Sequence, residues 1–74
     1  MNKVIEDLRN EIKWTRQSMR EQETALEEVK TKIAAGETDV IAPSYYLSSI
    51  RYLEGKIRAF ERAIDLVELA KLGA

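Results

Sequence analysis

The chain contains no cysteine and no histidine among its 74 residues. Their absence removes disulfide bonds, the commonest general base, the soft metal ligands and the commonest activated nucleophile. Glycine-rich phosphate loops, calcium-binding loops and serine-elbow patterns are also missing. Neighbouring acids such as Glu27 and Glu28 lie beside basic residues, which is typical of a solvated helix face. We therefore expect no enzymatic activity, no cofactor and no metal site.

Long hydrophobic runs are absent as well. No segment approaches the ~20 apolar residues of a membrane span, and Glu6 and Asp7 fall where a signal peptide needs apolar residues. With 12 basic and 13 acidic residues, the net charge of -1 gives no overall field that would draw the chain to nucleic acid or to anionic lipid. These features predict a soluble, cytoplasmic protein that does not associate with membranes.

Proline and glycine are scarce, and their positions divide the chain into two parts. Neither residue occurs between residues 2 and 35, whereas Gly36 and the only proline, Pro43, bracket a short segment. On both sides of that segment apolar residues recur at alternating steps of three and four, the period of an α-helix with one buried seam. The pattern predicts an all-α fold with one domain over residues 1–74, helices at about 2–35 and 44–72, and a loop at 36–43.

A loop this short forces the two helices to pack side by side as an antiparallel helical hairpin. Seam residues that face one another then have numbers that sum to about 79, which opposes apolar residues along the whole seam. On the charged flank the same register places Arg16 near Glu61 and Arg9 near Glu68. One continuous helical rod is the alternative fold, and the glycine and the proline contradict it.

Three residues do not fit the pattern of apolar seam and charged surface. Thr15 and Gln22 occupy seam positions of the first helix, and polar seam residues fix register and partner number at some cost in stability. Gly55 lies within the second helix, where glycine is about 1 kcal/mol less favourable than alanine. Gly55 is either a tolerated glycine on the solvent face or a point where a partner's backbone comes close.

One flank of the predicted hairpin carries small and apolar residues in place of charges. Two helices in a chain this short bury little apolar surface, and without disulfides or metals self-association is the remaining way to bury more. We therefore predict a homodimer in which two hairpins form a four-helix bundle of coiled-coil type. The predicted self-association residues are Trp14, Ser18, Ala25, Tyr52, Ala59, Ala63, Leu66, Leu69 and Ala70. The alternatives are that the small residues only let the hairpin's own helices approach closely, and that a foreign partner covers the C-terminal leucines.

The loop end collects apolar and aromatic residues, the types that carry most of the binding energy in interfaces. We predict that Val40, Ile41, Tyr45 and Tyr46 contact a protein partner, which the sequence does not identify. The chain would then be a small regulatory protein, acting as an adaptor, assembly factor or inhibitor. Its size also suits a phage or mobile-element accessory protein, which would act in the host cell. The alternative is that these residues only close the end of the bundle.

A nucleic-acid-binding regulator is the alternative function. It would use a basic band formed by Lys13, Arg16, Arg20, Arg51, Arg58 and Arg62. Acidic residues such as Glu54 and Glu61 are interleaved with these cations, whereas nucleic-acid-binding proteins usually present an unshielded basic patch. We therefore favour a protein partner.

Overall fold

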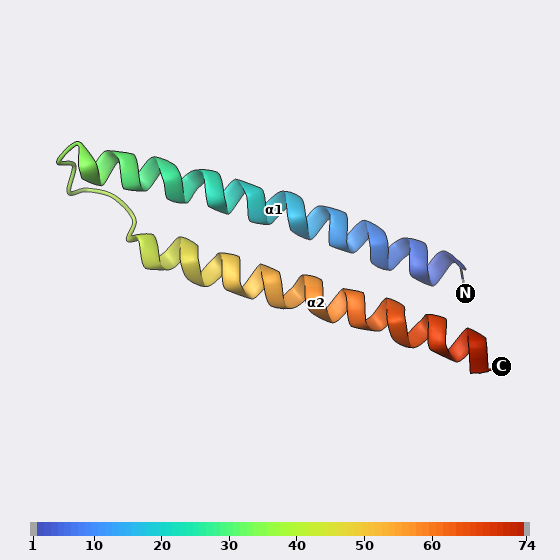
Figure 1. Cartoon of the computed structure of the whole chain (residues 1–74). Coiled ribbons are helices and arrows are strands. Elements are labelled where there is room, and N and C mark those ends of the chain that lie inside the picture. The colour runs from blue at the N-terminus through green and yellow to red at the C-terminus, as the bar shows by residue number, and fades with distance from the viewer. Residues whose placement is uncertain (1, 74) are drawn as a thin grey trace.

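The computed structural model describes residues 2–73, with side chains from residue 3 onward, and consists of two long helices packed side by side (Figure 1). Helix α1 spans Asn2–Ala34 and helix α2 spans Pro43–Gly73. The predicted antiparallel hairpin is confirmed, and every observed helix boundary lies within one residue of its predicted position. Residues 1 and 74 of the predicted domain lie outside the described residues.

The glycine that follows the end of helix α1 adopts a left-handed conformation. Gly36 has a φ of 90°, which residues with a side chain rarely adopt. The N–H of Gly36 donates to the carbonyl of Ile33, and the N–H of Glu37 donates to the carbonyl of Lys32, both at 3.0 Å. This pair of bonds is the Schellman motif, which satisfies carbonyls that the end of a helix would otherwise leave without partners.

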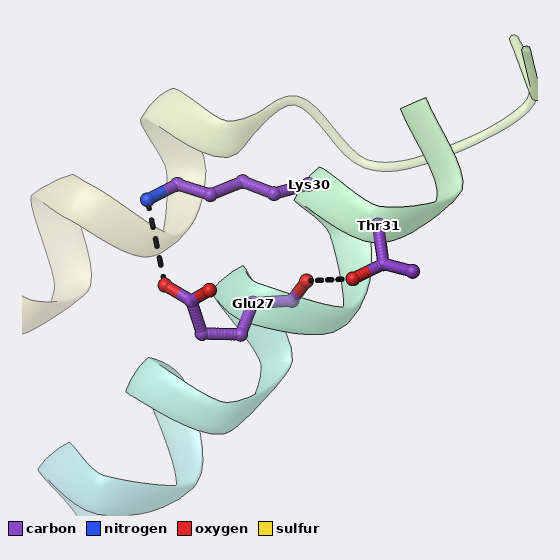
Figure 2. A network of polar contacts seen from close by, with 3 residues as sticks. All are labelled: Glu27, Lys30 and Thr31. Carbon is purple, nitrogen blue, oxygen red and sulfur yellow. Dashed lines mark hydrogen bonds and ion pairs between the residues drawn. The ribbon is translucent and has the colours of Figure 1, made fainter. Parts of the chain in front are cut away.

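Local polar contacts support the last turns of α1 (Figure 2). Lys30 Nζ lies 3.5 Å from Glu27 Oε1, and the hydroxyl of Thr31 donates to the Glu27 carbonyl at 3.0 Å. These contacts join residues three or four positions apart, which face the same side of a helix. They are exposed, so each contributes only a few tenths of a kcal/mol, roughly, to helix stability.

Helix α2 begins directly at Pro43. Proline suits a first helical position because its ring fixes a helical φ and its missing N–H would have had no partner there. The N–H of Tyr45 donates to the carbonyl of Ala42 at 3.0 Å, which forms the first turn. The observed start is therefore one residue before the predicted one, which was at about residue 44.

The core is one seam between the helices, and α1 contributes most of its buried residues. Ile5, Ile12, Leu26 and Val29 of α1 are buried, together with Ile57 of α2. The other apolar residues of the α2 seam are only half-buried; they are Tyr46, Ile50, Leu53, Phe60, Ile64 and Val67. Within residues 3–73 no large side chain is completely enclosed, because two helices cannot surround a side chain on all sides.

The hairpin is long and thin, with extents of 61 × 16 × 12 Å. Its radius of gyration is 17.3 Å, whereas a compact domain of this length would have one of about 11 Å. Its accessible surface is 5742 Å², compared with about 4,700 Å² for a compact monomer of the same mass. The single hairpin therefore leaves roughly 1,000 Å² more surface in water than a compact fold would.

Candidate interaction surfaces

The charged flank carries ion pairs that join α1 to α2. Arg9 Nη2 lies 4.0 Å from Glu68 Oε1, and Arg16 Nη2 lies 3.8 Å from Glu61 Oε2. Both pairs were predicted from the antiparallel register, so this part of the register is confirmed. The four side chains are more than half exposed, and exposed pairs contribute about 0.2 to 1 kcal/mol each, so they align the helices more than they stabilise them.

Half of the predicted basic band lies together in one groove. Lys13, Arg16 and Arg20 of α1 line this groove, and α2 contributes Glu61 and Asp65 to its other wall. The cations therefore lie next to carboxylates, one of which is already paired with Arg16. This arrangement weakens the positive field that a phosphate backbone would require.

The other half of the predicted basic band lies elsewhere. Arg51, Arg58 and Arg62 are exposed on α2 and do not line the groove. Arg9 and Trp14, which were not part of the predicted basic band, are among the other residues that line the groove. Arg9 was recognisable from its place on the charged flank, but Trp14 was assigned to the opposite flank and nevertheless lines the groove.

The large residues predicted for self-association are exposed in the single hairpin. Trp14 is 65 % exposed, Tyr52 is 68 % exposed and Leu66 is 53 % exposed. Leu69 is exposed as well, on the neighbouring face of α2. Burial of such a side chain in an interface stabilises an assembly by about 1.5 to 3 kcal/mol. Because these side chains are exposed, the single hairpin lacks this stabilisation.

The small residues predicted with them divide into two groups. Ala25 and Ala63 are half-buried, which fits the alternative that they let the hairpin's own helices approach closely. Ser18, Ala59 and Ala70 are exposed, so neither helix of the hairpin covers them. Close approach of the hairpin's own two helices therefore explains only the half-buried residues of this flank. The exposed residues are accessible to a further helix.

The loop end presents two of its four predicted partner-binding residues to solvent. Ile41 is 56 % exposed and Tyr45 is exposed to a similar extent, whereas Val40 and Tyr46 are half-buried. The rings of Tyr45 and Tyr46 meet edge to face, with centroids 5.3 Å apart and planes at 87°, a favourable geometry for aromatic pairs. The two tyrosine rings therefore contact each other in a defined geometry. Ile41 is exposed, so it does not close the end of this hairpin.

Two further apolar residues at this end were not predicted to be exposed. The numbers of Ile33 and Tyr46 sum to 79, so the predicted register places them opposite one another in the seam. However, 45 % of the surface of Ile33 is exposed, so the seam opens before the loop. Leu47 is also exposed. Its position outside the seam pattern was the only signal in the sequence that could have identified it.

The two polar seam residues have different environments. Thr15 is buried, and its hydroxyl donates to the carbonyl of Glu11 at 2.7 Å, so its polar group is satisfied within α1. The Oε1 atom of Gln22 is buried without a hydrogen-bond partner. Thr15 therefore needs no partner chain, whereas Gln22 carries an uncompensated desolvation cost.

At Gly55 an added Cβ would meet nothing within 4 Å, so no part of the hairpin requires a glycine there.

Within the described residues no three acidic side chains converge in a way that could hold a metal ion, and neither α1 nor α2 is apolar enough over its length to cross a membrane. The surfaces that carry the predicted binding residues are the groove, the flank of small and apolar residues, and the loop end. Comparison of the chain with protein-family models, with curated proteins and with solved structures finds no match in any of the three.

Proposed function

We propose that the protein is a non-enzymatic protein–protein interaction module that acts as a homodimer of hairpins. The observation that supports this function best is the exposure of large apolar and aromatic side chains along a structure whose seam buries few residues. Proteins that remain monomeric seldom expose connected apolar patches, and larger patches mark interaction sites. The homodimer would be a four-helix bundle of coiled-coil type, formed through the flank that carries Tyr52 and Leu66.

The loop end is the proposed site for a foreign protein. Ile41 and Tyr45 are exposed apolar and aromatic groups, and the exposed acids Glu37 and Asp39 lie in the same loop. An apolar anchor with a charged rim is the usual composition of a protein interface. Because the loop lies at the tip of the hairpin, a dimer formed through the flank would leave Glu37, Asp39 and Ile41 accessible, whereas Tyr45 lies where the loop end meets the flank.

Self-association is tested by sedimentation equilibrium at micromolar concentrations. We expect a species of about 17 kDa, twice the 8.5 kDa of one chain. Detection of only the 8.5 kDa species would exclude the dimer.

Foreign partner binding is tested by affinity capture with the tagged chain and two matched single variants. Ile41→Ser removes an exposed apolar group of the loop end, and Leu72→Ser removes an exposed leucine at the opposite end. We expect wild type and the leucine variant to recover the same protein and the loop variant to lose it. Equal recovery by both variants would place the site elsewhere.

Nucleic acid is the competing ligand class, and the groove lined by Lys13 and Arg20 would bind it. The carboxylates of Glu61 and Asp65 in the same groove are the reason that we prefer a protein. If RNA or DNA retention on a filter fell steeply with added salt and Arg20→Glu abolished it, the nucleic-acid function would replace the proposed one.

A further inference from the structure

Helix α2 carries a second stripe, about a quarter of a turn away from the seam that contacts α1. From Tyr45 to Ala70 its positions step by four and three without interruption, the same spacing as the seam itself. The stripe includes the exposed side chains of Tyr52 and Leu66, and small residues occupy most of its other positions. Most of the stripe is not covered by α1: only Ser49 and Ala63 are half-buried, and its other residues are exposed.

We infer that this stripe binds the same stripe of a second copy, with the two α2 helices antiparallel about a two-fold axis. This inference rests on the proposed homodimer. The axis passes between Lys56 and Ala59, so that facing residues have numbers that sum to about 115. A two-fold interface must be self-complementary, because each residue that contacts a second one is contacted by it in return. The α2 stripe meets this condition.

The large residues of the stripe face small ones in this register. Tyr45 faces Ala70 of the second copy, and Tyr52 faces Ala63. Alternation of large and small side chains across an interface is the arrangement that fills the space between two helices without voids or clashes. Ala70 is exposed and Ala63 is half-buried in the single hairpin, so each leaves part of its surface open to a ring of the second copy.

The remaining pairs follow the same rule. Leu66 faces Ser49, and Lys56 faces Ala59, where its aliphatic stem can cover the alanine while its ammonium group reaches solvent. Parallel helices would instead place each Lys56 against the other and each tyrosine against its own copy. Sliding the antiparallel pair by one heptad in either direction leaves Tyr45 or Ala70 without a partner.

The charges of α2 favour the same orientation. Its first half, residues 43–58, holds three cations and one acid, whereas residues 59–73 hold three acids and two cations. Antiparallel helices bring the basic half of each copy beside the acidic half of the other, and parallel helices bring like charges together. The roughly 1,000 Å² of surface that the hairpin exposes beyond a compact fold is also close to the 800 Å² or so per partner that a standard interface buries.

Cysteine cross-linking tests the register directly, because the chain has no cysteine of its own. Equal amounts of Lys56→Cys and Ala59→Cys chains, distinguished by a tag, are mixed and oxidised in a glutathione buffer. We expect the mixed disulfide to exceed both same-residue disulfides, since each of those is displaced by about 4.5 Å along the helix and disulfide geometry is narrow. Glu54→Cys mixed with Glu61→Cys is the control, because these residues have the same sum but lie on the opposite side of α2.

Two alanine variants test the contribution of the stripe to affinity. Leu66→Ala should weaken the dimer about 100-fold, since each dimer loses two leucine side chains from the interface. Leu47→Ala, which truncates an exposed leucine on the far side of α2, should leave the dissociation constant unchanged. Sedimentation equilibrium measures both variants beside the wild type.

The outcomes separate this inference from the proposed function. A wild type that remains monomeric would overturn both the α2 interface and the proposed dimer. A wild-type dimer in which the mixed disulfide does not predominate, or in which Leu66→Ala and Leu47→Ala behave alike, would overturn only the α2 interface. Cross-linking through Glu54→Cys and Glu61→Cys would assign the dimer to the charged flank instead.

Discussion

Replacing Gln22 with leucine should make the hairpin more stable. Gln22 lies in the seam of α1, and its Oε1 atom is buried without a hydrogen-bond partner. Removing an amide oxygen from water without replacing its hydrogen bond costs about 1 to 3 kcal/mol. Leucine at this position avoids that cost and adds apolar surface opposite Ile57, which is already buried.

We expect the free energy of unfolding to rise by about 1 to 3 kcal/mol in Gln22→Leu, which corresponds to an increase in Tm of roughly 6 to 19 °C for a domain of this size. Thermal and urea unfolding, followed by circular dichroism at one protein concentration, measures the change. Sedimentation of the same variant reports whether Gln22 also fixes the number of partners, since a polar seam residue with that role prevents a mixture of oligomers.

Gln17→Leu is the matched control for this prediction. Gln17 is exposed on α1 and undergoes the same change of side chain, so its stability should stay within about 0.5 kcal/mol of the wild type. If Gln22→Leu proved no more stable than Gln17→Leu, the unpaired amide oxygen would not be a source of instability, and our interpretation of the seam would be wrong.

Other predictions concern the backbone and the charged flank. Gly55→Ala should stabilise the hairpin by about 0.5 to 1 kcal/mol, because alanine favours the helix and its Cβ meets nothing within 4 Å. Gly36→Ala should destabilise it by about 1 kcal/mol, because the φ of 90° strains a residue that has a Cβ. Urea unfolding measures the free energy of unfolding of both variants, which should rise in Gly55→Ala and fall in Gly36→Ala. A change of the same sign in both variants would contradict these predictions. A double-mutant cycle with Arg16→Ala and Glu61→Ala should give a coupling of about 0.2 to 1 kcal/mol that decreases with salt; a coupling insensitive to salt would refute a solvent-exposed pair.

The sequence predicted the fold because each element has a strong local cause. The steps of three and four determine the seams, and matching seams on either side of a short loop determine the antiparallel register. The ion pairs Arg9–Glu68 and Arg16–Glu61 follow from that register alone. Gly36 marked the end of α1 because only glycine readily adopts the conformation found there.

The environment of individual side chains was harder to predict. Ile33 fits the seam pattern, but the first turn of α2 does not cover it, and a periodic pattern does not report where two helices diverge. The hydroxyl of Thr15 finds a carbonyl in its own helix while Gln22 Oε1 finds none, a difference that depends on side-chain length and rotamer. Exposure of Ile41 and Tyr45 agrees with the predicted partner site but does not test it, because the partner's own surface is not encoded in this chain.

The central claim is that one hairpin leaves apolar surface that a second copy covers, so that folding and association are coupled. The dependence of Tm on protein concentration tests this claim most directly, since association with a second chain stabilises the folded state by mass action. Between about 1 and about 100 µM we expect the Tm to rise by roughly 9 °C. A Tm that is the same at every concentration, with cooperative unfolding throughout, would show that the single hairpin is stable by itself and would contradict the claim.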